Sequence, residues 1–190
     1  MTLTGKDIWI ANLLLGDGVT DDTAAINAAI ASGSRCVEGA PGCQSATTSP
    51  AVVYFPAGTY LISSSVLPYY MTQLIGDPNN MPVLKATASF SGLGLVDADP
   101  YGSANPDYGT TNVFYRQVRN LVFDTTSIPA GTAATGIHWP TAQATSLQNC
   151  VFQLSQASPN SHVGVFIENG MCHGHKFMLL LISLQALVAS

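Results

Sequence analysis

The sequence predicts an all-β fold in which coils of parallel strands stack into a solenoid, closed at its N-terminal end by a short helix. Short apolar strands separated by turn clusters follow one another from residue 52 onward. Segments of the second half recur at an offset of 28 or 29 residues, which suits one solenoid turn carrying a loop insertion. The run GDGVTDDTAAINAAI, residues 16–30, has the pattern of a turn followed by a small amphipathic helix.

The helix is predicted from its own start signals. The GDG turn allows positive φ angles, so the chain can reverse there. Thr20, Asp21 and Asp22 then offer oxygen atoms to the unsatisfied N–H groups of a helix start. A helix of about ten residues is not stable alone. Its apolar face, which includes Ile26 and Ile30, must therefore cover another part of the molecule.

The strands of the first half are short and end at turn residues. The turn between the first two strands is Pro56–Gly58. Residues 97–111 are rich in Asp, Pro, Gly, Asn and Tyr and are predicted to form a long loop, the kind of excursion on which solenoids build binding surfaces. The predicted strands are Val52–Phe55, Thr59–Ser63, Gln73–Ile75, Val83–Ala86 and Leu93–Val96.

The second half contains an internal repeat, and its aligned segments are expected to stack in adjacent coils. The alignment puts Asn120 opposite Asn149 at equivalent bends, where asparagine tolerates a left-handed backbone and its amide can bond to the next coil. It also puts Phe123 beside Phe152 in the core. The aligned pairs are Arg119–Asp124 with Gln148–Gln153, and Thr135–His138 with Val163–Phe166.

Composition limits the possible partners. Hydrophobic residues make up 47% of the 190 residues and charged residues 9%, and six basic against eleven acidic side chains give a net charge of −5. This balance argues against nucleic acid or another polyanion as partner and fits a neutral ligand such as a polysaccharide. No signal peptide is visible in residues 1–10. The apolar stretch 177–189 is too short to span a membrane.

The cysteines are candidates for a disulfide, and the clusters of acidic, cysteine and histidine residues are candidates for metal binding. Cys36 and Cys43 bracket a short loop and are predicted to form a disulfide, with two free thiols as the alternative. Cys150 reads as a small core residue. The acidic run 17–22 does not have the spacing of an EF-hand, and the cluster at 172–175 lacks a fourth ligand. We therefore expect no metal and no cofactor.

The motifs resemble a known family. GDGVTDDTAAINAAI followed by VVYFPAGTYLIS resembles the opening of the pectate-lyase-type right-handed parallel β-helices, in which such a helix caps the first coil. RQVRNLVFDTT, GIHWPTAQATSLQNCVFQ and GVFIENG are more specific and resemble the N-terminal β-helix of glycoside hydrolase family 55, the fungal exo-β-1,3-glucanases, as do RCVEGAPGC, YYMTQLIGD and DADPYG. The resemblance implies a secreted enzyme that acts on β-1,3-glucan, without a cofactor, and that is monomeric at full length.

The resemblance also predicts how the chain is organised. It covers residues 16–170, preceded by an uncertain segment 1–15 and followed by a tail, 171–190, that departs from the family. We interpret the tail as a gene-prediction artefact and the chain as a truncated β-helix. Met171 stands where the family has a serine.

Inverting hydrolysis of a glycosidic bond needs a general acid and an activated water molecule on the opposite face of the sugar. The resemblance implies that the acid is a glutamate of a second β-helix, beyond this chain, and that Gln143 positions the water. The chain alone is therefore expected to be inactive.

Other side chains near this region have two interpretations each. Trp139 and His138 are candidate sugar-binding residues, with packing inside the solenoid as the alternative. Asp124 and Glu168 lie at predicted strand ends, where a role in a cleft competes with a solvated edge. Two other functions remain open at this stage: a pectin-active lyase or polygalacturonase, and a non-catalytic module that binds glucan or is purely structural.

Overall fold

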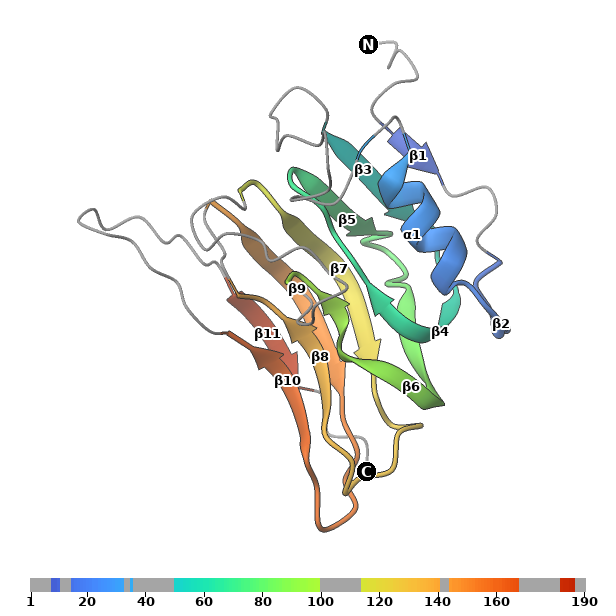
Figure 1. Ribbon diagram of the computed structural model, residues 1–190, viewed down its shortest axis with the longest axis vertical. Coiled ribbons are helices and arrows are strands. Elements are labelled where there is room, and N and C mark those ends of the chain that lie inside the picture. Colours follow the sequence, from blue (N-terminus) through green and yellow to red (C-terminus); the bar gives the residue numbers. More distant parts are fainter. Residues whose placement is uncertain are drawn as a thin grey trace, which may run out of the picture.

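The computed structural model describes residues 8–10, 15–32, 35, 50–99, 114–140, 144–167 and 182–186, with the first and last of these ranges described as backbone only. One helix and a set of strands make up this part of the chain (Figure 1). The helix α1 spans Thr23–Ala31. The strands are β1 (Ile8–Ile10), β2 (Asp17–Asp21), β3 (Ala51–Phe55), β4 (Thr59–Val66), β5 (Thr72–Gly76), β6 (Val83–Asp97), β7 (Gln117–Asp124), β8 (Ala134–His138), β9 (Ser146–Gln153), β10 (His162–Phe166) and β11 (Ile182–Ala186).

Every strand pairs in parallel with strands of the neighbouring coils, and the pairs form three faces. The first face joins β1, β3, β5 and the beginnings of β7 and β9. The second joins β2, the beginnings of β4 and β6, and the ends of β7 and β9. The third joins the ends of β4 and β6 with β8 and β10, while β11 continues from β9. This arrangement confirms the predicted parallel β-helix.

The core is built from columns of side chains that repeat from coil to coil. Neighbouring strands lie about 4.8 Å apart, so side chains in register are in contact. One column on the first face consists of Val53, Leu74, Val118 and Leu147, all fully buried. A column on the second face consists of Tyr60, Leu84, Phe123 and Phe152.

The helix covers the first coil, as predicted, with Ile26 and Ile30 fully buried against the core. Its predicted capping is only partly correct. Asp21 accepts a hydrogen bond from the Thr23 N–H at 3.0 Å. The Asp22 side chain makes no capping bond and instead accepts from the backbone N–H groups of Leu15 (2.9 Å) and residue 16 (3.2 Å), which fastens the incoming chain to the helix start.

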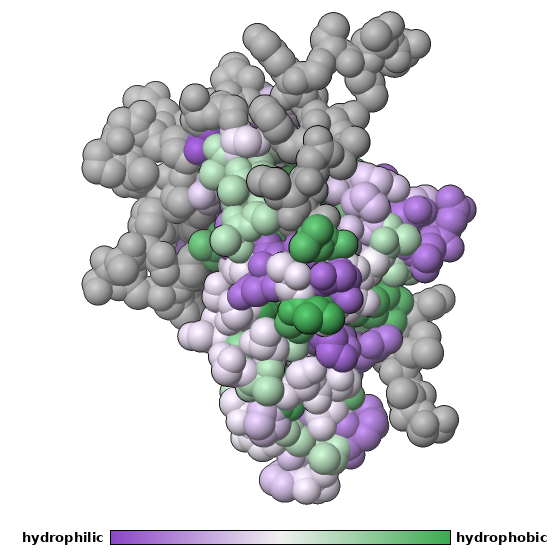
Figure 2. All heavy atoms as spheres, turned by 90° about the vertical axis from the view of Figure 1, so that its right-hand side faces the viewer, coloured by the Kyte–Doolittle hydropathy of each residue, from purple (hydrophilic) through white to green (hydrophobic). Residues whose placement is uncertain are grey.

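Figure 2 shows the side of the molecule that carries α1 and β2. Small hydrophobic patches alternate there with hydrophilic ones. Leu15 and Val19 are strongly exposed on this part of the chain, and the carboxylate of Asp17 accepts hydrogen bonds from the N–H groups of Val19 and Thr20. The acidic run 17–22 therefore holds its own backbone in place through hydrogen bonds.

The internal repeat is confirmed residue by residue. β7 pairs with β9 through Arg119 and Gln148 as well as Asp124 and Gln153, and β8 pairs with β10 through His138 and Phe166. The rings of Phe123 and Phe152 stack at 5.3 Å. Asn120 and Asn149 both have left-handed backbones, and the Asn149 side-chain N–H donates to Asn120 Oδ1 at 3.0 Å.

One predicted strand boundary is wrong. The sequence predicts two strands at Val83–Ala86 and Leu93–Val96, whereas the structure has one bent strand, β6, that crosses from the second face to the third. Gly92, with φ 152°, lies in the bend, where the polar sequence between the two apolar stretches resembles a loop. No helix among the described residues is long and apolar enough to cross a membrane.

Candidate functional site

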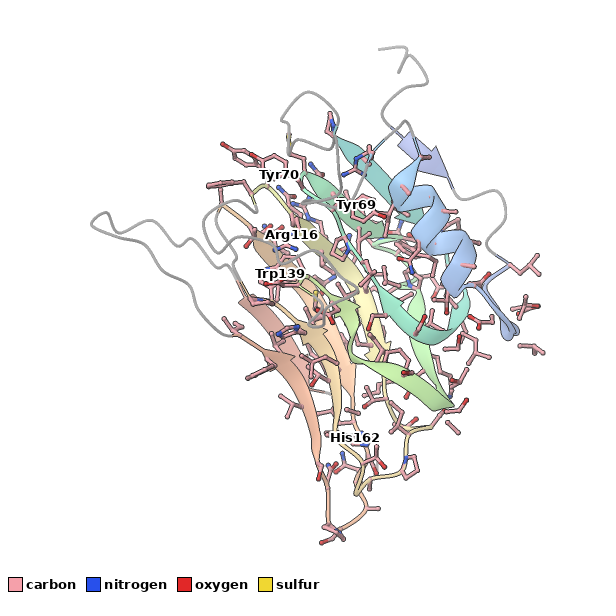
Figure 3. The ribbon with its side chains drawn as sticks, viewed as in Figure 1. Tyr69, Tyr70, Arg116, Trp139 and His162 are labelled. Atoms are coloured by element: carbon pink, nitrogen blue, oxygen red, sulfur yellow. The ribbon has the colours of Figure 1, made fainter. Side chains whose placement is uncertain are left out.

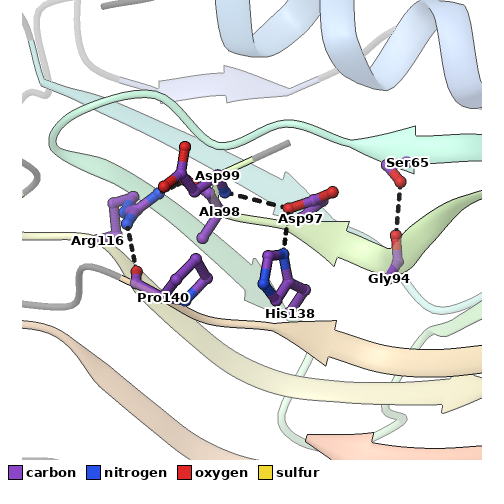
Figure 4. Close-up of polar contacts among 8 residues, drawn as sticks. All are labelled: Ser65, Gly94, Asp97, Ala98, Asp99, Arg116, His138 and Pro140. Atoms are coloured by element: carbon purple, nitrogen blue, oxygen red, sulfur yellow. Dashed lines mark hydrogen bonds and ion pairs between the residues drawn. The ribbon is translucent and has the colours of Figure 1, made fainter. Parts of the chain in front are cut away.

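The most polar region of the core lies at the corner where β6 and β8 end and the chain leaves the third face. Asp97 and His138 occupy the same register position in adjacent coils, and both are buried. The His138 Nδ1 atom lies 2.7 Å from Asp97 Oδ1 (Figure 4). The imidazole also stacks on the ring of Phe166 in the next coil, with centroids 5.4 Å apart.

Arg116 is the second element of this corner. It immediately precedes β7, has no exposed surface and donates from Nη1 to the Ala98 carbonyl and from Nη2 to the Pro140 carbonyl, the latter at 3.4 Å (Figure 4). Its guanidinium lies over the Trp139 ring, 5.1 Å from the centroid. Arginine suits this position because its planar group can stack and bond at once. We call Asp97, Arg116, His138, Trp139 and Thr145 the corner cluster.

Trp139 fixes the other side of the corner. It is fully buried, its backbone N–H donates to the Phe166 carbonyl at 2.8 Å, and its indole N–H donates to Thr145 Oγ1 at 3.1 Å. This last bond joins the two flanks of segment 141–143. Figure 3 shows Trp139 next to Arg116 on the same edge of the sheet.

The sequence-predicted site residues fall into two groups. His138 and Trp139 are brought together in the corner cluster, and both side chains are fully buried, which favours the packing alternative. Their role in sugar binding stays a prediction. Gln143, Glu168 and the pair Cys36 and Cys43 lie outside the described residues, as does the cluster at 172–175.

Asp124 is described and serves the solenoid. It is nearly buried, lies 3.1 Å from the Lys85 ammonium of the preceding coil, and accepts from the N–H of Thr126 at 2.8 Å. A carboxylate held in this way stabilises the stack of coils. The interpretation of Asp124 as part of a solvated edge is therefore wrong, because the carboxylate is buried and paired with Lys85.

Sequence reasoning missed Arg116 and His162. His162 Nδ1 lies 2.9 Å from Thr125 Oγ1 and its Nε2 lies 3.4 Å from the Pro129 carbonyl, so it joins two coils at the far end of β7. Arg116 lies directly before a strand, in a chain that has only six basic residues. This scarcity of basic residues was the available sign that the position of Arg116 matters. Among the described residues, no three His, Cys, Asp or Glu side chains gather as metal ligands would.

Known proteins resemble this chain over most of its length. Over 157 residues it is 51% identical to a glucan 1,3-beta-glucosidase of Cochliobolus carbonum, an alignment covering 82% of this chain and 20% of that protein. A probable glucan endo-1,3-beta-glucosidase of Arthroderma benhamiae is 49% identical over 158 residues, covering 82% and 18%. A protein of Penicillium expansum named non-secreted LysM effector LysM19 is 51% identical over 156 residues, covering 82% and 12%.

The chain therefore spans about a fifth or less of the length of these relatives. A solved structure, ORF18 of Geobacillus virus E2, matches with a TM-score of 0.56 and 21% identity over 76% of this chain and 25% of that one, a likeness in fold. A family model described as rhamnogalacturonase A/epimerase, pectate lyase-like, matches residues 14–178. The parallel coils, the capping helix and this match together show that the chain belongs to the pectate lyase-like family.

Proposed function

We propose that this chain contributes the water-positioning and glucan-binding part of an inverting exo-β-1,3-glucanase. The observation that carries the proposal is the identity of about half of all aligned residues, over 82% of the chain, with a protein named glucan 1,3-beta-glucosidase and one named probable glucan endo-1,3-beta-glucosidase. The low charge of the chain agrees with a neutral polysaccharide.

The corner cluster gives this proposal a physical basis. The described residues on either side of Gln143 are fastened to the core, while Gln143 itself lies outside the described residues. Trp139 and Thr145 are bonded to each other across it, and the Pro140 carbonyl accepts from Arg116. A water-positioning amide is useful only if its backbone is held within a fraction of an ångström, and buried side chains behind it are the usual means. In this proposal the cluster is support and does not touch substrate.

We further propose that the general acid comes from outside this chain. The carboxylates of Asp97 and Asp124 are buried and engaged with His138 and Lys85, and that of Asp22 holds backbone N–H groups. Glycoside hydrolysis needs two carboxyl or equivalent groups facing one sugar. These three carboxylates are committed to structural contacts, which supports a general acid supplied from outside the chain.

The test is a chimera in which this chain replaces the matching fifth of the Cochliobolus carbonum protein. We expect glucose release from laminarin by the chimera and none by the 190-residue chain. Gln143→Ala in the chimera should lower kcat by about 100-fold or more, the range of a lost proton-transfer or positioning group. A matched Gln156→Ala, at an exposed turn, should leave it unchanged. Hydrolysis of laminarin by the 190-residue chain alone would refute the proposal that the general acid lies outside this chain.

Two further functions have an observation in their favour. The matched family model is named after rhamnogalacturonase, so the same chimera should be assayed on polygalacturonate and rhamnogalacturonan, and activity there without activity on laminarin would replace our proposal. The relatives named as LysM effectors favour a non-catalytic module. An inactive chimera whose free chain still binds laminarin would support that alternative.

The remaining expectations belong to the same proposal. We propose that the enzyme acts outside the cell as a monomer and that Cys36 and Cys43 form a disulfide. The relatives named as non-secreted make localisation a direct test. Peptide mapping without reduction should find the two cysteines linked, and culture medium rather than cell lysate should contain the protein. A reduced pair or a cell-retained protein would contradict these points.

A further inference from the structure

The corner at which each coil enters the first face has an unusual backbone. Met71, Tyr115 and Ala144 have φ angles of 54°, 60° and 49°. Each lies two residues before a register position shared by β5, β7 and β9, so the three stack from coil to coil. A left-handed backbone is unfavourable for a residue with a bulky side chain.

Tyr115 is the exceptional member of this stack. At the other left-handed corner of the same coils the chain uses Asn120 and Asn149, which adopt this conformation more readily. A glycine or asparagine would relieve the strain at position 115 as well. Because Met71 and Ala144 share this backbone, the left-handed corner belongs to the fold, but the fold does not require a tyrosine at position 115.

The Tyr115 ring belongs to an aromatic group at this edge. The rings of Tyr70, Phe114 and Tyr115 lie 5.9 to 6.2 Å apart, centroid to centroid. Tyr115 is 45% exposed, and the other two side chains are half-buried. Figure 3 shows Tyr70 on the edge of the sheet that also carries Arg116 and Trp139. We call these three rings the aromatic platform.

The platform is held from behind by the buried part of the corner. The Phe114 carbonyl accepts from the Met71 N–H at 3.1 Å, and the Arg116 carbonyl accepts from the Ser146 N–H at 3.1 Å. Arg116 itself is anchored in the corner cluster. On the Tyr70 side, Arg35 donates to the Tyr70 carbonyl at 2.7 Å. Tyr115 thus projects from a backbone that is fixed on both sides.

This arrangement suits a neutral sugar. A rigid, amphipathic tyrosine face offers apolar contact at low entropic cost, and its hydroxyl group can meet a polar rim. The platform consists of two tyrosines and one phenylalanine, residue types that carry no formal charge at pH 7. Tyr70 and Tyr115 come from adjacent coils, with their ring centroids 6.2 Å apart, whereas Phe114 is the chain neighbour of Tyr115 in the same coil.

We propose that the aromatic platform is a binding subsite for a neutral β-glucan, with Tyr115 stacking on one pyranose ring. The inference rests on the proposed function and deepens it. Ala144, the member of the corner stack in the next coil, directly follows Gln143 in the sequence. The subsite would therefore guide the glucan along the edge that leads to the water-positioning segment.

The test is the affinity of the 190-residue chain for laminarin, measured by isothermal titration, with polygalacturonate as the charged comparison. Tyr115→Asn removes the ring but keeps a residue that fits the backbone. We expect about three- to tenfold weaker laminarin binding, the effect of one lost aromatic contact, with no loss of thermal stability. Tyr115→Phe should bind like the unaltered chain. Val163→Asn is the control, because Val163 is 46% exposed on β10.

The outcomes separate this inference from the proposed function. If the unaltered chain and Tyr115→Asn bind laminarin equally, the platform is not a glucan subsite, even if the chimera hydrolyses laminarin. Weaker binding by Val163→Asn to the same degree would also overturn it. Tyr115-dependent binding in the chain, together with an inactive chimera, would support the platform while refuting the enzymatic proposal. Stronger binding to polygalacturonate than to laminarin would overturn the inference that the ligand is a neutral glucan.

Discussion

The asparagine pair at the bends of β7 and β9 allows hydrogen bonding and backbone strain to be measured separately. Asn149 donates to Asn120 Oδ1 at 3.0 Å and has φ 50°. Asn149→Ala removes the partly buried hydrogen bond to Asn120, about 1 kcal/mol, together with a weak 3.5 Å contact to Met81 Sδ. It also places a residue without a helpful amide in the left-handed region, at about 1 to 2 kcal/mol. We expect the free energy of unfolding to fall by about 2 to 3 kcal/mol.

Asn149→Gly removes the same bond without the strain, at an entropic cost of about 0.5 to 1 kcal/mol. It should be less destabilising than Asn149→Ala by about 1 kcal/mol. The assay is urea unfolding followed by far-UV circular dichroism, comparing midpoints at equal slope. Asn120→Ala combined with Asn149→Ala should destabilise less than the sum of the two, because both remove one shared bond. A glycine variant no more stable than the alanine variant would refute the strain argument, and additive single variants would refute the shared bond.

Three other outcomes follow from the same structure. Gly76→Ala should lower stability by about 3 kcal/mol, since its Cβ would lie 2.0 Å from the Asn120 carbonyl oxygen, whereas Gly131→Ala, with nothing within 4 Å, should stay within about 0.5 kcal/mol in the same urea assay. Burial raises the pKa of the Cys150 thiol to about 12, so native protein should leave it unlabelled by a thiol reagent at pH 8, and labelling without urea would contradict this. Burial also raises the pKa of Tyr60 to about 12 from 10.0, which favours the neutral phenol in the folded state. The stability that this pKa shift contributes is fully present below pH 10 and is lost as the pH rises towards 12. Tyr60→Phe should remove that part of the pH dependence of the free energy of unfolding.

The stacking of β7 on β9 and of β8 on β10 could be predicted from sequence because both pairs recur at nearly the same offset, 29 and 28 residues. Val118 and Leu147 occupy one core column at an offset of 29, and their neighbours align without gaps. The earlier coils are hidden because their corners differ in length. Between the first two faces the chain uses Pro56–Gly58 in one coil, residues 77–82 in the next, and a single asparagine in β7 and β9. Hydrophobic alternation identified the strands but not their register.

The corner cluster was beyond sequence reasoning for a related reason. Asp97 and His138 are 41 residues apart, and their pairing depends on the whole path between β6 and β8. The burial of His138 agrees with the packing alternative that the sequence offered for it. Nothing in the local sequence of Arg116 or Trp139 indicates that one side chain lies over the other.

The spacing along the first-face column has a consequence for how the chain folds. Val53 and Leu74 are 21 residues apart in the sequence, and Leu74 and Val118 are 44 apart. Val118 and Leu147 are then separated by 29. Closing the longest of these loops carries the largest entropic penalty, and the parallel pairing gives no local hairpin to nucleate it. We expect the coils on either side to form early and their docking through β5 and β7 to limit the folding rate. Hydrogen exchange during refolding should then protect the amides joining those two strands last.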